Sequence, residues 1–461
     1  MHLESLSRDR TIHLSGIGGS AMIGLARILR QRGFEVAGTD PQGEPVRSEL
    51  AAIGITLETV QDGSRIPPDT QLVVATAALP ADHPELAAAR AREITVVKYA
   101  RVLAALLDER EGVAVAGTHG KTTTTAMIVS ALRAAGVDPG FLLGGRVSAF
   151  GAGADIGSAD VFVAEACEFD RSFLVLRPCH AVILNVEADH LDVYGDLAAV
   201  RSAFADFAGR LSPDATAFFC ADDPGLGSLL ERIAARRFSF GLAAGADIRA
   251  TGICQGPEGS TFEVAVRGAT IGTARLRVPG LHNVTNALAA LAVGLERGLP
   301  FHELAAGLGE FGGVCRRFEL RGEAGGVTVV DDYAHHPTEI RALLRAARQR
   351  FPGRRLVVVF QPHQVARTRL LAAGFAEVLA AEADRVVLTD IYAARSGNGE
   401  DTGSGDLARR IAARGGAVAH VPGLGDVAAA LRGILRAGDV LLTVGAGDVH
   451  RVAGVVLADR G

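Results

Sequence analysis

The amino-acid sequence predicts an α/β protein of three domains, and three observations support this. The chain has 461 residues, which corresponds to about three domains at about 150 residues each. Apolar strand-like runs alternate with amphipathic helical stretches, a pattern typical of parallel sheets connected by helices. Two glycine-rich turns, at 16–24 and 117–120, each follow such a strand and precede such a helix. We expect domains at 1–110, 111–313 and 314–461.

The composition excludes several classes of protein. Hydrophobic residues make up 48% and charged residues 21%, a balance typical of globular chains. Although mean hydropathy is +0.25, no uninterrupted apolar run reaches the ~18 residues of a membrane span. The net charge of −5 does not favour a nucleic-acid partner. An N-terminus without an apolar signal region and five scattered cysteines without a CxxC predict a cytoplasmic protein without a zinc site.

The first domain begins with a strand over 11–14, a glycine-rich turn, a helix over about 20–32 that ends at Gly33, and a strand over 34–38. This order, with an acid after the second strand, is typical of a Rossmann-like nucleotide fold. The last glycine, Gly24, comes later than the G-x-G-x-x-G spacing requires, so a purely structural turn is the alternative. We predict a diphosphate or nucleotide pocket for the substrate at Gly16, Gly18, Gly19, Ser20 and Asp40.

The second domain opens with a strand over 113–116, the segment GTHGKTTT at 117–124, and a helix over about 122–135. A glycine-rich loop that opens a helix binds phosphate through backbone N–H groups, which predicts a P-loop ATPase-like domain. The usual first glycine is replaced by Val115, and a glycine-rich structural turn is the alternative. Lys121 would contact the β- and γ-phosphates and is one of only two lysines, the other being Lys98. The predicted phosphate-loop residues are Gly117, Thr118, His119, Gly120, Lys121, Thr122 and Thr123.

Acidic residues follow two further strand-like runs, at 161–164 and 182–184. Ligands of open α/β sheets bind beyond the carboxyl ends of strands, and Mg²⁺ prefers oxygen ligands. We therefore expect Mg²⁺ to be bound by Thr122, Glu165 and His190. Glu168 and Asp170 belong to the same acidic segment, but a solvated turn explains them equally well.

Polar motifs continue towards the C-terminus. Asn283 and Asn286 are three residues apart, so on a helix they face one way, as a nucleotide contact requires. The adjacent Arg316 and Arg317 could hold transferred phosphate from the third domain, or could be an ordinary exposed pair.

The third domain contains further strand-like runs at 327–330, 356–360, 385–388 and 440–444, which predict a Rossmann-like open α/β sheet. Asp332 follows the first of them and is a candidate ligand contact. The pair at 335–336 could bind a metal or form a turn before Pro337.

In this order the motifs resemble the Mur ligases of bacterial peptidoglycan synthesis over essentially the whole chain. The segments that carry the resemblance are GIGGSAMIG, GTHGKTTT, EACEFDRSF, NVEADHLD, PGLHNVTN, GGVCRRFE, DDYAHHPTE, FQPHQVARTR and DIYAAR.

The resemblance implies an enzyme whose three domains bind a UDP-sugar, ATP and an amino acid. It would use ATP and Mg²⁺ to join L-alanine to the carboxylate of UDP-N-acetylmuramate through an acyl phosphate. It further implies catalytic roles for Lys121, Glu165, His190 and Arg317, ATP contacts at Asn283, Asn286 and Asp332, and a substrate contact at His335. We expect a monomer or homodimer.

Three alternatives remain at this point. Residues 99–101 read Tyr-Ala-Arg where the family usually has Arg-Ala-Glu, which leaves open a murein peptide ligase that adds a whole tripeptide to the same sugar. A dehydrogenase would use the first glycine turn but leaves the phosphate loop unexplained. A GTPase switch would need an Asn-Lys-x-Asp base reader, which a chain with lysine only at 98 and 121 does not contain.

Overall fold

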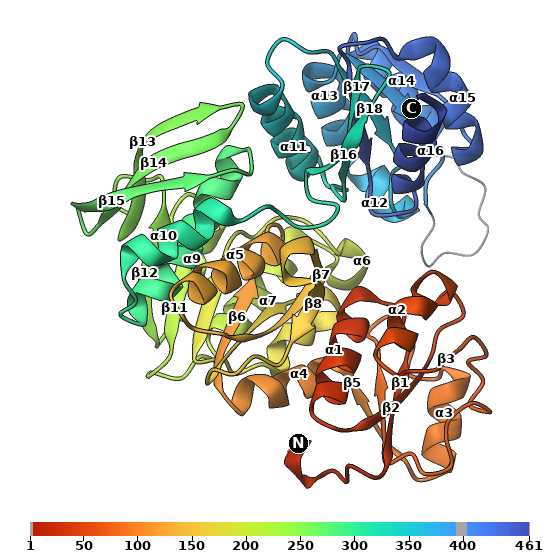
Figure 1. The fold of residues 1–461 in the computed structure, drawn as a ribbon, viewed down its shortest axis with the longest axis vertical. Coiled ribbons are helices and arrows are strands. Elements are labelled where there is room, and N and C mark those ends of the chain that lie inside the picture. Colours follow the sequence, from red (N-terminus) through yellow and green to blue (C-terminus); the bar gives the residue numbers. More distant parts are fainter. Residues whose placement is uncertain (1–2, 393–402, 461) are drawn as a thin grey trace.

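The structure is a computed structural model that describes residues 3–392 and 403–460 (Figure 1). Three β-sheets, each accompanied by helices, follow one another along the chain. The N-terminal and C-terminal domains lie at different ends of the central one, and each packs on it through a helix, α1 (Ser20–Gln31) and α11 (Pro337–Arg350) respectively (Figure 1). The predicted α/β class is therefore confirmed. Within the described residues, no helix is both long and apolar enough to cross a bilayer.

The N-terminal sheet has five parallel strands in the order β3-β2-β1-β4-β5, as in a Rossmann-like fold. Helix α1 ends where predicted, because Gly33 adopts φ of +81°, a left-handed conformation that ends helices. The strands are β1 (Thr11–Ser15), β2 (Glu35–Thr39), β3 (Leu57–Glu58), β4 (Leu72–Ala75) and β5 (Thr95–Lys98). The helices are α1 (Ser20–Gln31), α2 (Arg47–Ala52), α3 (Pro84–Ala91) and α4 (Tyr99–Asp108).

The central sheet has ten strands in the order β15-β14-β13-β12-β11-β10-β6-β9-β7-β8. Its middle is parallel, whereas β8 and the β14–β15 hairpin are antiparallel edges. The β-rich stretch predicted near 247–278 thus extends this sheet. The strands are β6 (Glu111–Ala116), β7 (Gly140–Val147), β8 (Ala152–Asp155), β9 (Val161–Ala166), β10 (His180–Ile183), β11 (Thr216–Cys220), β12 (Arg236–Gly241), β13 (Ile248–Gly256), β14 (Gly259–Val266) and β15 (Ala269–Leu276). The helices are α5 (Lys121–Ala134), α6 (Leu191–Tyr194), α7 (Leu197–Ala208), α8 (Gly227–Leu230), α9 (Leu281–Glu296) and α10 (Phe301–Glu310).

The C-terminal sheet has six strands in the order β16-β17-β21-β18-β19-β20, parallel except for the β16–β17 pair. Helix α11 begins with Pro337 because its fixed φ suits the first helical turn. The strands are β16 (Glu319–Ala324), β17 (Val327–Asp332), β18 (Leu356–Phe360), β19 (Arg385–Leu388), β20 (Val418–His420) and β21 (Val440–Val444). The helices are α11 (Pro337–Arg350), α12 (Val365–Leu370), α13 (Ala372–Glu382), α14 (Ser404–Ala413), α15 (Leu424–Ile434) and α16 (His450–Arg460).

The N-terminal domain packs on the central domain through α1, which lies against β7 and β8. Gly24 of α1 makes this close approach possible, since a Cβ at that position would lie 3.1 Å from Cβ of Ala154. The late glycine of the first turn is thereby explained. Gly24 allows two domains to pack closely, so its position need not follow the glycine spacing of a phosphate-binding dinucleotide turn.

Candidate active site

The segment 117–120 forms a tight turn between β6 and α5. Gly117 has φ of +147°, and a Cβ there would lie 2.9 Å from Cβ of Leu184. Gly120 has φ of +85°, the left-handed conformation that glycine adopts readily, directly before α5 begins at Lys121. Free N–H groups at such a helix start favour a bound anion. The turn has the backbone form that a phosphate loop requires.

The end of strand β10 holds this turn in place. The Asn185 side chain accepts a hydrogen bond from the His119 N–H at 2.8 Å and donates one to the His119 carbonyl at 3.1 Å. The Glu187 N–H donates to the Thr118 hydroxyl at 2.9 Å. Sequence reasoning did not single out Asn185, although its place at a strand end beside the metal-binding motif was a usable signal.

Lys121 is bound by an acid that sequence reasoning ranked low. Its Nζ lies 2.8 Å from Oε2 of Glu168, which is 1% exposed, and also donates to the Thr118 carbonyl at 3.1 Å. Burial opposes the lysine charge, but Glu168 outweighs it and raises the pKa of Lys121. The ammonium group is therefore charged, and it lies across the turn, where it can meet a phosphate.

Glu165 ends β9 beside Lys121 and Thr122. Its carboxylate accepts a hydrogen bond from the Gly144 N–H. Burial raises its pKa, while the Gly144 amide, Lys121 and the Thr122 hydroxyl oppose the rise. A buried carboxylate whose ionised form is disfavoured would gain from a bound cation. This observation fits Glu165 and Thr122 to the predicted Mg²⁺ site.

His190 lies close to the same acids, in the left-handed conformation with φ of +51°. Its Nε2 is 3.9 Å from Oε1 of Glu168 and 3.9 Å from Oδ2 of Asp189. Burial lowers the pKa of His190, so the neutral imidazole that can bind a metal is favoured. Thr122 with Glu165, and His190 with Glu168, thus place a hydroxyl, carboxylates and an imidazole near Lys121, donor types compatible with a divalent cation.

A cavity adjoins the turn, between the central and C-terminal domains. Asn283 and Asn286 both face it from α9, and the Asn286 Nδ2 donates to Oδ1 of Asn283 at 3.3 Å. His282 also lines the cavity. Burial lowers its pKa to about 4, which keeps its ring neutral. Sequence reasoning did not assign His282. The predicted residues that line this cavity are His119, Gly120, Thr122, Thr123, Asn283, Asn286, Arg317 and Asp332.

The two adjacent arginines have different positions. Arg316 is held inside the C-terminal domain, where Nε donates to Asp331 at 3.1 Å and Nη2 to the Gly445 carbonyl at 2.7 Å. Arg317 instead lines the cavity, with Nη1 3.7 Å from Oε1 of Glu339. The expectation that the pair as a whole could hold phosphate is therefore wrong for Arg316, because its guanidinium is occupied by Asp331.

Asp332 lines the cavity but is largely engaged by backbone. Its two carboxylate oxygens accept hydrogen bonds from the N–H groups of Phe318 at 2.6 Å and Ala334 at 2.7 Å. Burial raises the pKa of Asp332 to about 6, although Arg317 and the two amides oppose the rise. Asp332 thereby ties the loop that carries Arg317 to the end of β17.

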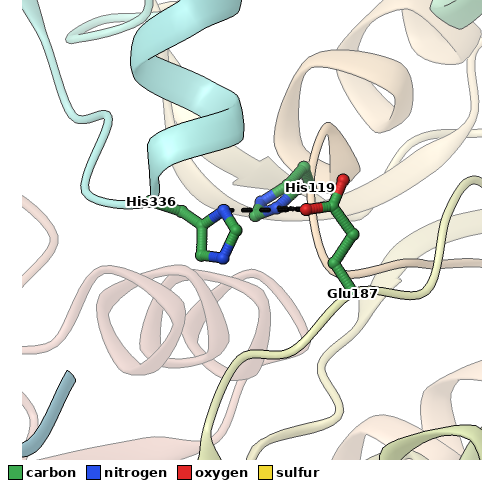
Figure 2. A group of neighbouring side chains, drawn as sticks. All are labelled: His119, Glu187 and His336. Atoms are coloured by element: carbon green, nitrogen blue, oxygen red, sulfur yellow. Dashed lines mark ion pairs between the residues drawn. The ribbon is translucent and has the colours of Figure 1, made fainter. Parts of the chain in front are cut away.

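His335 and His336, like the two arginines, have different surroundings. The His335 Nε2 lies 3.9 Å from Oδ2 of Asp189, whereas His336 belongs to a second group. Figure 2 shows this group: His119 and Glu187 from the central domain meet His336 at the start of α11. Both imidazoles lie 3.7 Å from Oε2 of Glu187.

The three residues in Figure 2 have the ligand types of a metal site, with ligand atoms within 4.8 Å of one another. However, burial is outweighed by Glu339 and Glu187, which raise the pKa of His119 to about 9, so its ring is protonated. The Nδ1 of His336 accepts from the Thr338 N–H at 3.3 Å. Because the acids favour the charged form of His119 over the effect of burial, we interpret the group as an ionic contact between the central and C-terminal domains.

A further contact between these domains was missed from the sequence. Arg367 of α12 donates from Nε and Nη2 to Oδ1 of Asp189, at 2.9 and 2.7 Å, and both side chains are buried. Together with His190 and Gln364 they line a second cavity. Of the motif at 390–395, residues 393–395 lie outside the described part of the chain.

In the N-terminal domain, the turn 16–19 is closed by Asp40. The Gly16 N–H donates to the Thr39 carbonyl at 2.8 Å, and the Gly18 N–H donates to Oδ2 of Asp40 at 3.0 Å. Ser20 begins α1. The five predicted residues are thus brought together, and Asp40 shapes the turn itself.

The fold and the site define a three-domain α/β protein whose glycine-rich strand–helix turn adjoins a cavity that a second domain completes. Comparisons with known families agree: residues 11–111 match the Mur ligase family catalytic domain, 115–294 the Mur ligase middle domain, and 316–447 the Mur ligase glutamate ligase domain. The chain belongs to the Mur ligase family.

Individual relatives cover nearly the whole chain. A UDP-N-acetylmuramate–L-alanine ligase of Salinibacter ruber is 43% identical over 450 residues, 97% of this chain and 94% of the relative. The solved UDP-N-acetylmuramate–alanine ligase of Thermotoga maritima is 28% identical, with a TM-score of 0.83 over 98% of this chain and 99% of that one. A murein peptide ligase of Psychrobacter arcticus is 26% identical, with a TM-score of 0.74 and the same coverage.

Proposed function

We propose that this protein is an ATP-dependent ligase that joins L-alanine to the carboxylate of UDP-N-acetylmuramate in peptidoglycan precursor synthesis. Membership of the Mur ligase family and 43% identity to a relative of that activity support the substrates. One structural observation carries the chemistry: the buried Lys121–Glu168 pair lies beside Glu165 and Thr122, next to a cavity that Arg317 enters from another domain.

In this proposal ATP lies in the cavity between the central and C-terminal domains. Its phosphates accept hydrogen bonds from the backbone N–H groups of 120–122 at the start of α5, and Asn283, Asn286 and Asp332 contact the nucleotide. Lys121 turns from Glu168 to the β- and γ-phosphates. Arg317 neutralises charge on the transferred phosphoryl group from the opposite side. Phosphoryl transfer depends mainly on such positioning and charge neutralisation, and it requires no protein nucleophile.

Thr122, Glu165 and His190 would hold Mg²⁺. When bound, the cation neutralises phosphate charge. Glu165 is suited to this role because desolvation raises its pKa despite the Gly144 amide, Lys121 and the Thr122 hydroxyl, so a bound cation would stabilise its charge. His190 is suited because its ring is held neutral.

The reaction then has two steps. The sugar carboxylate attacks the γ-phosphorus of ATP, forming an acyl phosphate and ADP. The amine of L-alanine attacks the acyl carbon, an amide bond forms, phosphate leaves with the bonding electrons, and the amine loses a proton. Activation is needed because a carboxylate is a poor electrophile. The N-terminal turn with Asp40 would hold the UDP part, and His335 would face the reacting end.

Release of inorganic phosphate tests the proposal. Rapid release should require ATP, Mg²⁺, UDP-N-acetylmuramate and L-alanine together, and equal turnover with ATP alone would contradict it. The murein peptide ligase alternative predicts instead that a tripeptide replaces L-alanine. Ala at Glu165 or His190 should reduce turnover by orders of magnitude and leave UDP-sugar binding intact, because that pocket belongs to another domain.

The proposal also covers the domain limits, the cellular location and the assembly state of the protein. We place the domain limits at 1–110, 111–313 and 314–461, the protein in the cytoplasm, and its assembly as a monomer or homodimer. Light scattering on the purified protein distinguishes the two assembly states, and a larger oligomer would contradict both.

A further inference from the structure

Lys98, one of the two lysines of the chain, has a specific partner in another domain. It is the last residue of β5, the edge strand of the N-terminal sheet, and it forms an ion pair with Asp170 of the central domain. No recognisable motif surrounds Lys98 in the sequence. The structure shows that both lysines bind the same short segment, because Lys121 pairs with Glu168, two residues before Asp170.

Lys98 lies between the two glycine-rich turns, one in the N-terminal domain and one in the central domain. β5 is separated from β1 only by β4, so the end of β5 lies about 10 Å along the sheet edge from the turn after β1, at about 4.8 Å per strand. Both lie at carboxyl ends of parallel strands, where ligands bind. From Lys98 the ion pair leads directly to the segment that holds Lys121.

The ion pair is not needed to hold the two domains together. The side chain of Lys98 is 52% exposed and that of Asp170 is 34% exposed. Exposed ion pairs contribute only about 0–1 kcal/mol. The domains are already joined by α1 packing on β7 and β8 and by Arg146 of the central domain, which donates to Oε2 of Glu49 at 3.2 Å. The Lys98 ammonium can therefore exchange its partner at little cost.

We infer that Lys98 binds the carboxylate of the sugar substrate, and that Asp170 holds Lys98 in place when the substrate is absent. The inference rests on the proposed function, which requires a sugar-borne carboxylate to travel from the N-terminal turn to the phosphate loop. At this sheet edge the Lys98 ammonium is exposed, and Asp170 already presents a carboxylate to it, the same chemical group that the sugar would bring. Lys98 is thus a substrate-positioning residue specific to the acidic end of the sugar.

Binding calorimetry with two ligands tests this directly. UDP-N-acetylmuramate carries the carboxylate, and UDP-N-acetylglucosamine is the matched ligand without it. Lys98→Met should weaken UDP-N-acetylmuramate binding by about 10–100-fold, the range expected for a lost charged hydrogen bond, and leave UDP-N-acetylglucosamine binding unchanged. Lys98→Arg should restore most of the difference. In turnover assays, Lys98→Met should raise KM for the sugar and leave KM for ATP unchanged.

Asp170→Asn is the control that separates substrate binding from a role in docking the domains. It removes the partner and keeps the Lys98 charge, so UDP-N-acetylmuramate should bind as tightly as before or more tightly. If Asp170→Asn weakens binding as Lys98→Met does, or if Lys98→Met keeps the full preference for the acidic sugar, the inference is wrong. If the wild-type protein itself has no preference for UDP-N-acetylmuramate over UDP-N-acetylglucosamine, the proposed function fails instead.

Discussion

The two glycine-rich turns of this protein share a backbone form and differ in their surroundings. Each joins a buried strand to a helix at the carboxyl edge of a parallel sheet, with a glycine in the left-handed region, Gly16 at +80° and Gly120 at +85°. The first turn is closed by Asp40 from its own domain. The second carries Lys121 and is surrounded by acids from neighbouring strands and by residues of the C-terminal domain. The two turns therefore share a backbone form but differ in the charged side chains that surround them.

The domains that flank the central sheet also dock differently. The N-terminal domain packs on the central one through α1, with Gly24 at a close approach, and adds the more exposed ion pair of Lys98 with Asp170. The C-terminal domain is held on the central one, beside the cavity, by largely buried charged contacts, including Arg367 with Asp189 and His119 with Glu339. Ionic contacts can be exchanged for charged ligand groups, whereas apolar packing cannot.

The largest expected effect separates the two turns by function. Lys121→Ala should reduce kcat about 10³-fold, as expected when a preorganised charge on the reacting group is removed. The binding constant for UDP-N-acetylmuramate should stay within a factor of two, because that ligand contacts the other turn. Phosphate-release kinetics and calorimetry on the same variant measure both. A loss of less than tenfold in kcat would show that the second turn does not have the separate role in the reaction that we propose for it.

The arginine pair offers the next comparison. Arg317→Ala should reduce kcat by about 10²–10³-fold without lowering thermal stability, since its side chain faces the cavity. Arg316→Ala should instead destabilise the protein by about 3 kcal/mol, because the buried Asp331 loses its ionic partner. Thermal unfolding should therefore show a loss of stability for Arg316→Ala, whereas kinetics should show the loss of kcat for Arg317→Ala. Equal effects of the two variants on both measurements would show that the two residues share one role.

Alanine in each turn should affect a different substrate. At Gly18 a Cβ would lie 2.8 Å from Oδ2 of Asp40, so Gly18→Ala should raise KM for the UDP-sugar about tenfold and leave KM for ATP unchanged. Gly120→Ala should raise KM for ATP by a similar factor, because alanine in the left-handed region costs about 1–2 kcal/mol. If Gly18→Ala instead raises KM for ATP, the two turns are coupled.

The smallest effect concerns pH and the ionic contact of His119. The folded pKa of His119 is raised to about 9 from 6.5, so its contribution to stability is complete below pH 6.5 and is lost as pH rises through about 9. Glu187, whose pKa is lowered to about 2 against the effect of burial, stays ionised throughout. The difference in unfolding temperature between wild type and His119→Gln should therefore be largest below pH 6.5 and should vanish above pH 9. A difference independent of pH would exclude the ionic role.

Local patterns predicted much of the site. A strand followed by glycines and a helix predicted both turns, and the spacing of Asn283 and Asn286 predicted that they face one way, as they do in the cavity. The separate fates of Arg316 and Arg317 could not be predicted, since adjacent residues have the same local sequence and only contacts with Asp331 and Glu339 distinguish them. The role of Glu168 could not be predicted either, because it depends on a contact with Lys121, which lies 47 residues earlier in the chain.

The sequence by itself determined the elements, the two turns, and the family, because strand and helix periodicity, glycine conformations and motif order are properties of neighbouring residues. Only the tertiary structure decided which charges meet. Lys98 with Asp170, Asp189 with Arg367 and His119 with Glu339 each join residues from different domains. Such contacts depend on how separate sheets pack, and electrostatic interaction falls with distance in space regardless of separation along the chain.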